Sequence, residues 1–255
     1  MCKHLFSSVV CCFVWIALLS GQAFAAEDAR ELFNGKDLQD WDGNPELWSV
    51  EDGAIVGRTT AERPISGNTF LVYKGKVASD FRLTLEYRIE GGNSGVQYRS
   101  KVTDPKKWVV KGYQADIDSK PTYTGILYEE GGRGILTKRG QFTKIDAKGA
   151  AESAQFADPV ELQKAVHTDD WNTYLIEVVG SHLKHTINEK RMSETDDLDA
   201  EKRSVDGVLA LQVHAGPPMT VRFRKLRLEE VDAKSAAAAG AAASQSPAET
   251  GAAGK

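Results

Sequence analysis

Apolar and polar residues alternate along much of the chain, most clearly over residues 81–89. Every odd position from Phe81 to Ile89 is apolar, and every even position is polar. Successive side chains of a strand point to opposite faces, so this pattern predicts a strand with one buried face. The same reasoning predicts further strands at residues 48–50, 54–57, 69–73, 95–100, 113–118, 125–128, 171–179, 182–187, 207–214 and 220–229.

Turn residues separate these strands at short intervals, and Asp52-Gly53 between the first two is a strong hairpin signal. One helix is well signalled, within a weakly patterned segment at residues 143–170. Asp158 is a suitable N-cap, Pro159 fits the first helical position, and Glu161 can complete a capping box. Many short strands and one short helix predict an all-β sandwich or jelly roll of two antiparallel sheets.

The first 25 residues are typical of an export signal. Lys3 precedes an apolar run from Val9 to Leu19, which is too short to span a bilayer, and Ala23-Phe24-Ala25 is a small-residue cleavage site. We therefore predict cleavage before Ala26 and a periplasmic or secreted bacterial protein. An uncut membrane anchor is the alternative.

Residues 26–232 are long enough for one sizeable sandwich domain. Residues 233–255 are rich in Ala, Gly and Ser and are predicted to form a disordered tail. All three cysteines precede residue 26, so the mature domain has no disulfide, thiol nucleophile or thiolate metal site. The net charge of −4, with both signs interspersed, argues against a nucleic-acid partner and, after signal cleavage, a membrane partner.

Several predicted strands carry hydrogen-bonding side chains opposite their apolar set. If these strands share one sheet, they form a single polar face, bordered by glycine-rich segments at 91–95 and 131–134 that permit close approach of a ligand or simply make turns. Planar and bidentate groups predominate there and suit sugar hydroxyls, although a plain solvated face is the alternative. The polar face comprises Glu86, Arg88, Gln97, Arg99, Gln114, Asp116, Gln212 and His214.

Six motifs follow one another along the chain, at Leu32–Trp41, Trp48–Ile55, Gly92–Arg99, Gly112–Ile117, Thr124–Tyr128 and Val221–Leu228. Together they resemble the 3-keto-disaccharide hydrolase domain family, also described as 3-keto-glucoside 1,2-lyase/3-keto-2-hydroxy-glucal hydratase. The resemblance spans nearly the whole predicted domain. Gln114 stands where many relatives have Glu, so no carboxylate role is carried to that position.

The resemblance implies a concanavalin A-like jelly roll with its site on the concave sheet. It also implies export and action on glycosides already oxidised at C3. The expected substrate is a 3-keto sugar, and a sugar 3-dehydrogenase acting upstream is an expected partner. The linkage, the anomer and the aglycone are left open.

Elimination from a 3-keto-glycoside needs a base for the C2 hydrogen, a group that stabilises the enolate, and a proton donor for the leaving oxygen. The candidates for the base are His214, Asp116 and Glu86. The candidates for enolate stabilisation are Arg88, Arg99 and Arg133, or a divalent metal held by carboxylates and His214, although no ligand spacing indicates one. The proton-donor candidates are Tyr128 and Glu129, and the other substrate-binding candidates are Asn93, Gln97, Gln114 and Gln212.

Two other readings remain open. Asp116 and Arg99 can form a cross-strand ion pair with no catalytic role. The whole domain can instead be a non-catalytic, lectin-like carbohydrate-binding module, since fold alone does not separate the two. Tyr87, Tyr98 and Tyr113 all fall on the apolar set, so no aromatic platform is assigned to the polar face, which favours the enzyme.

Overall fold

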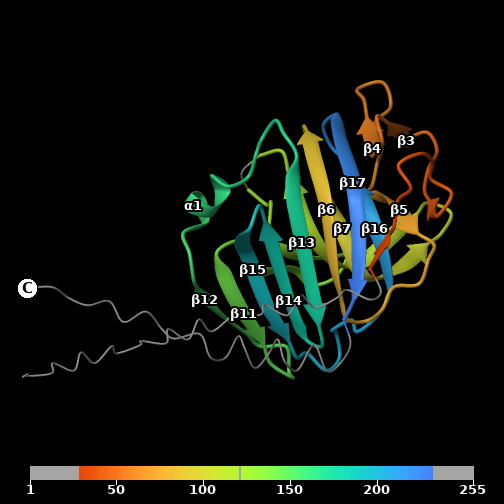
Figure 1. Ribbon diagram of the computed structural model, residues 1–255. Coiled ribbons are helices and arrows are strands. Elements are labelled where there is room, and N and C mark those ends of the chain that lie inside the picture. Colours follow the sequence, from red (N-terminus) through yellow and green to blue (C-terminus); the bar gives the residue numbers. More distant parts are fainter. Residues whose placement is uncertain (1–28, 121, 232–255) are drawn as a thin grey trace, which may run out of the picture.

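The described residues, 29–120 and 122–231, form two sheets packed face to face in the computed structural model shown in Figure 1. The predicted export signal at 1–25 and the predicted tail at 233–255 lie outside this range. Among the residues described, no helix is long and apolar enough to cross a membrane.

The ten-stranded sheet lies in front in Figure 1, and its neighbouring strands are antiparallel except for the parallel pair β11 and β15. β1 (Ala29–Glu31) pairs with β17 at one end of that strand. In spatial order the other strands are β12 (Ala151–Gln155), β11 (Gln141–Ile145), β15 (Lys190–Asp197), β14 (His182–Ile187), β13 (Asn172–Val179), β6 (Phe81–Glu90), β17 (Met219–Glu230), β4 (Ala54–Thr59) and β3 (Trp48–Glu51).

The seven-stranded sheet lies behind it and is antiparallel throughout. Its strands are β10 (Gly134–Thr137), β9 (Leu127–Glu130), β8 (Val109–Asp118), β7 (Asn93–Asp104), β16 (Val208–Val213), β5 (Thr69–Tyr73) and β2 (Trp41–Asp42).

The helix α1 (Pro159–Gln163) begins where the sequence predicts, because the Asp158 carboxylate accepts a hydrogen bond from the Val160 N–H at 2.7 Å. Glu161 forms an ion pair with Lys164 at 2.6 Å. The helix follows a hairpin, β11 and β12, that extends one edge of the ten-stranded sheet, and it contacts β15.

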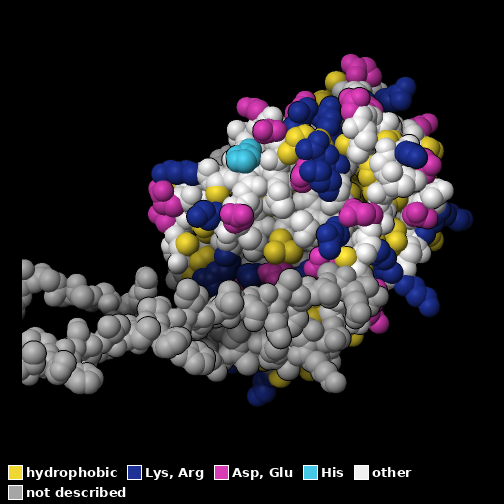
Figure 2. Space-filling view, in the orientation of Figure 1, with side chains coloured by type: hydrophobic (Ala, Val, Ile, Leu, Met, Phe, Trp, Pro, Cys, Tyr) yellow, Lys and Arg dark blue, Asp and Glu magenta, His cyan; other side chains and the backbone are white. Residues whose placement is uncertain are grey.

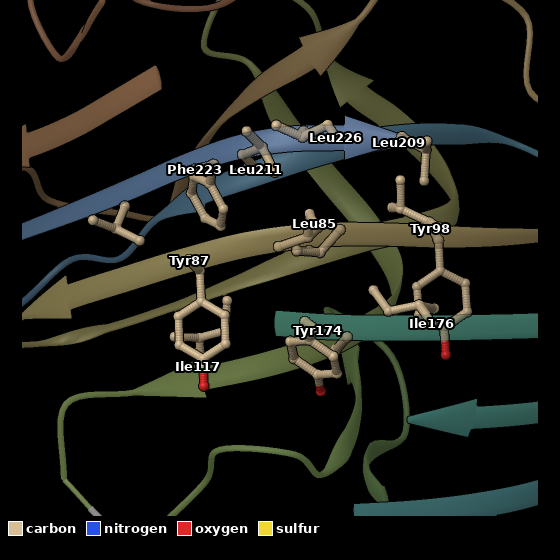
Figure 3. Close-up of a cluster of buried hydrophobic side chains, with 14 of the residues drawn as sticks. Leu85, Tyr87, Tyr98, Ile117, Tyr174, Ile176, Leu209, Leu211, Phe223 and Leu226 are labelled. Carbon is tan, nitrogen blue, oxygen red and sulfur yellow. The ribbon is translucent and has the colours of Figure 1, made fainter. Parts of the chain in front are cut away.

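The core lies between the two sheets, and strand alternation places it correctly. The apolar positions of β6 are all buried, and those of β8 face them from the other sheet. Figure 3 shows Leu85 and Tyr87 of β6 close to Phe223 and Ile117 within this core. Each large apolar side chain buried this way contributes about 1.5–3 kcal/mol relative to exposure.

Alternation does not reveal which sheet a strand joins. For this reason the prediction that Glu86 and Arg88 belong to the polar face is wrong. β6 belongs to the ten-stranded sheet, whereas the other strands of the predicted polar face belong to the seven-stranded sheet. Glu86 and Arg88 therefore lie on the opposite outer face of the molecule. Glu86 accepts from Arg224 Nε at 2.6 Å and Lys225 Nζ at 2.7 Å. Figure 2 shows this face, where basic and acidic side chains are interspersed as on an ordinary solvated surface.

Candidate active site

Part of the outer face of the seven-stranded sheet is covered by the chain's own β7–β8 hairpin. The hairpin tip crosses β16 and reaches β5, where the Phe70 N–H donates to the Trp108 carbonyl at 3.0 Å. The Trp108 indole N–H donates to Asp42 at 3.0 Å. Val110 packs with Phe70 and Ala210 in a small apolar cluster on this face. The hairpin therefore covers the face around Phe70 and Ala210.

Beside the hairpin, that face carries a cavity of about 520 Å³, a volume in the usual range for small-ligand sites. Five of its lining residues were predicted from the sequence, namely Asn93, Gln114, Asp116, Tyr128 and His214. The cavity is also lined by residues that were not predicted from the sequence, among them Asn68, Asp118, Lys120, Tyr123 and Glu130.

Asp116 is the titratable group best suited to catalysis in this cavity. Its side chain is almost fully buried, and its carboxylate accepts a hydrogen bond from Gln114 Nε2 at 2.5 Å. Burial raises the pKa of Asp116 to about 7, against the opposing effect of hydrogen bonds from Gln114 and Asn93, and the charges of Asp118 and Glu130 raise it further. The carboxyl therefore exchanges its proton near neutral pH, as a general base or acid requires.

A chain of buried amides fixes the position of Asp116. Ser100 Oγ donates to Gln97 Oε1 at 2.7 Å, Gln97 Nε2 donates to Gln114 Oε1 at 2.8 Å, and Gln114 in turn donates to Asp116. Gln212 Nε2 also donates to Gln114 Oε1, at 3.0 Å. Gln97 and Gln212 are fully buried, so they orient Gln114 and Asp116 instead of reaching the cavity.

Gly95 makes room for this arrangement. It lies directly opposite Asp116 in the β7–β8 register. A Cβ atom at position 95 would stand 2.5 Å from Gln114 Cγ, a distance that real Cβ atoms do not adopt. Gly95, which belongs to the third motif, is therefore needed to leave space for the Gln114 side chain.

Glu130 supplies a second carboxylate to the cavity. It accepts from Asn68 Nδ2 at 3.0 Å and from Gln212 Nε2 at 3.4 Å. It lies two residues after Tyr128 on β9, and the period of two places both side chains on the cavity side of the sheet. That period was the sequence signal for Glu130.

Glu129 and Arg133, both predicted to bind substrate, lie elsewhere, and that prediction is wrong. Glu129 lies between two cavity residues of β9, so its side chain points to the other side of the strand. There it pairs with Arg133 at 2.7 Å, and Arg133 also pairs with Asp197 at 2.6 Å and Asp199 at 3.4 Å. These four side chains form a mostly buried ion-pair cluster, which we call the Arg133 cluster.

A family comparison now bears on this site. The model of the 3-keto-alpha-glucoside-1,2-lyase-like domain matches residues 28–229. The chain belongs to this family. The resemblance drawn from the six motifs is thereby confirmed, and it covers both sheets and every cavity residue named above. Comparison with curated proteins gives no match.

Solved structures confirm the predicted jelly-roll fold of this family member. A candidate glycosyl hydrolase of Parabacteroides distasonis is 20% identical with a TM-score of 0.53, over 80% of this chain and 100% of that one. A galectin-like protein of Bacillus subtilis is 10% identical with a TM-score of 0.53, over 80% and 95% of the two chains. A carbohydrate-binding module of Bacillus subtilis is 15% identical with a TM-score of 0.50, over 75% and 96%. At these identities the likeness shows the fold alone.

Arg99 is not at the cavity, so its predicted roles in substrate binding and enolate stabilisation are wrong. The β7–β8 register shifts after Tyr98, and Arg99 has a φ of 45°, which turns its side chain away from the polar face. Its guanidinium donates to the carbonyls of Ser79 and Gly180 and pairs with Asp80 at 2.9 Å. The cross-strand pair with Asp116 does not form.

His214 and Tyr128 line the cavity of the family member. His214 Nδ1 lies 2.6 Å from the Ala215 carbonyl, which can only accept, so Nδ1 is the donor of this hydrogen bond. Burial, followed by the charges of Glu130 and Asp116, raises the pKa of Tyr128, which keeps its hydroxyl a donor. In the part of the chain that the structure describes, no three His, Cys, Asp or Glu side chains are grouped to hold a metal ion.

Proposed function

We propose that this family member is an exported enzyme that cleaves 3-keto-glycosides by elimination followed by hydration. The observation that carries the proposal is the buried carboxyl of Asp116, whose pKa is raised to about 7, beside a cavity that also carries the hydrogen-bonding side chains of Asn93 and Gln114. A ketone at C3 acidifies the C2 hydrogen, so a base of this strength suffices to remove it. An oxidising enzyme of the sugar 3-dehydrogenase class must act first, because this chemistry requires the ketone.

Each step has a group in the cavity to carry it. Asp116 takes the C2 proton, and Lys120, the lysine of the cavity lining, stabilises the enolate oxygen at C3. The C1–O bond then breaks, and the leaving oxygen takes a proton from the Tyr128 hydroxyl. Water, oriented by Glu130 and His214, adds to C1 of the enone and gives one proton to the Tyr128 oxygen, while Asp116 returns its proton to C2. The net reaction is hydrolysis of the glycosidic bond.

The second candidate function is a non-catalytic carbohydrate-binding module. The observation in its favour is Tyr123, an aromatic side chain that lines the cavity and is 44% exposed, as platforms for sugar rings are. A buried carboxyl with a raised pKa has no use in simple binding, because an uncharged acceptor would bind hydroxyls without the cost of burial. We therefore favour the enzyme.

Comparing a 3-keto-glucoside with its unoxidised parent distinguishes the proposed enzyme from a binding module. We expect incubation with a 3-keto-glucoside to release the aglycone with transient enone absorbance, and the parent glucoside to remain intact. Cleavage of the parent glucoside would instead indicate ordinary two-carboxylate hydrolysis by Asp116 and Glu130. Saturable binding of unoxidised glycans with no turnover of either sugar would identify a binding module.

The pH dependence follows from the raised pKa of Asp116. The base acts only when ionised, so activity is lost as the pH falls below its pKa of about 7. We expect kcat/KM to fall about tenfold per pH unit on the acid side of this value. A pH–rate profile of the 3-keto-glucoside reaction measures this, and a flat profile between about pH 5 and 8 would contradict Asp116 as the base.

A further inference from the structure

The active-site cavity continues into a second cavity of about 280 Å³. The two are neighbours, because they have four lining residues in common, which are Thr122, Tyr123, Ile126 and Ile135. Together they form one groove that runs from Asp116 toward the start of helix α1. The four shared residues lie at the junction of the two compartments.

The second compartment has an apolar wall that the fold holds in place. Tyr123 and Ile135 are 44% and 43% exposed, which is unusual for large apolar residues of this chain, and Pro159 extends the wall. Arg139, which also lines the compartment, donates to the Pro159 carbonyl at 3.0 Å and the Thr124 carbonyl at 2.8 Å. These bonds tie the loop after β8 to the start of helix α1, so the compartment is formed before any ligand binds.

The course of the groove decides what reaches this compartment. The β7–β8 hairpin fills the face on the β5 side of the site, where Val110 packs on Phe70. A sugar bound beside Asp116 therefore cannot extend in that direction. The second compartment continues the site on its other side, and a group attached to the sugar has room there.

We propose that the second compartment binds the leaving group of the 3-keto-glycoside, and that it selects an aromatic aglycone over a second sugar. This rests on the proposed function. A flat apolar ring buries its faces against Tyr123, Ile126 and Ile135, whereas a sugar would leave hydroxyl groups against that wall without partners. Lys138 and Gln141, on the polar side, are suited to ring substituents that accept hydrogen bonds.

Two 3-keto-glucosides of one anomeric configuration, benzyl and methyl, test the proposal, because their leaving alkoxides are chemically alike and only benzyl reaches the second compartment. We expect Ile135→Asp to lower the benzyl-to-methyl ratio of kcat/KM by about tenfold, the usual effect of a lost apolar contact on discrimination. Tyr123→Ser should lower the same ratio. Val205→Asp places the same charge on a valine that is 52% exposed outside both cavities and should leave the ratio unchanged.

A 3-keto-disaccharide completes the test. If both variants cleave benzyl and methyl substrates with an unchanged ratio, the leaving-group assignment is overturned while the proposed function stands. If the ratio of disaccharide to methyl falls instead, the compartment takes a sugar and the aromatic preference is wrong. If the wild-type protein cleaves none of the three substrates, the proposed function and the assignment fall together.

Discussion

Asp116→Asn is expected to lower kcat/KM for a 3-keto-glucoside by about a thousandfold while the protein stays folded. Asparagine has nearly the shape of the carboxyl and can keep a hydrogen bond within the amide chain, but it cannot take the C2 proton. The substitution also removes a buried carboxyl whose ionisation is unfavourable, since burial is the largest cause of its raised pKa. The free energy of unfolding should therefore not fall at neutral pH.

Steady-state kinetics and urea unfolding of the purified variant measure both effects. Asp206→Asn makes the same chemical change at an exposed aspartate outside the cavity and serves as the control. Activity within about threefold of wild type in the Asp116 variant would show that another group is the base, because general bases contribute at least about a hundredfold.

Arg133→Met is expected to lower the free energy of unfolding by about 3–5 kcal/mol, the usual effect of removing one partner from a buried ion pair. The side chains of Glu129, Asp197 and Asp199 are 9%, 1% and 4% exposed, and Arg133 forms an ion pair with each of them. Without the guanidinium, the three carboxylates of the Arg133 cluster stay buried and have lost the one cation of the cluster. Since Tyr128 and Glu130 flank Glu129 on β9, the loss should also disturb the site.

Arg82→Met is the matched control for this measurement. Arg82 pairs with Glu177 on the outer face of the ten-stranded sheet, and its side chain is 46% exposed. Exposed pairs contribute about 0–1 kcal/mol, so the two substitutions should differ severalfold in urea unfolding. Equal effects would mean that the Arg133 cluster does not stabilise the fold.

Most of the fold was predictable from local sequence. β5 and β14 have the limits expected from alternation, and Asp52-Gly53 makes the β3–β4 turn with φ angles of 50° and 72°. Several strands were not predicted, among them β12 at the edge of the ten-stranded sheet and β15 two strands further in. Every side chain of β12 is exposed, and β15 points Ser193, Thr195 and Asp197 inward, so neither strand shows an apolar period of two.

The site was only partly predictable, for reasons that differ between residues. Gln114 and Asp116 follow simple alternation on a regular stretch of strand. Arg99 was misplaced because a bulge changes the side of the strand to which it points, and bulges leave no mark in a polar and apolar pattern. Glu86 was misplaced because alternation sorts faces within a strand and says nothing of which sheet the strand joins.

The folded-over β7–β8 hairpin has a consequence for the mode of attack on a glycan. Cleavage within a long chain needs a cleft open at both ends, so that sugar units can extend on either side of the reacting bond. Here the tip of the hairpin covers the sheet on the β5 side of the site, where the Phe70 N–H donates to the Trp108 carbonyl. Under the proposed function only the terminal unit of a glycoside can enter, so the enzyme is built for exo attack.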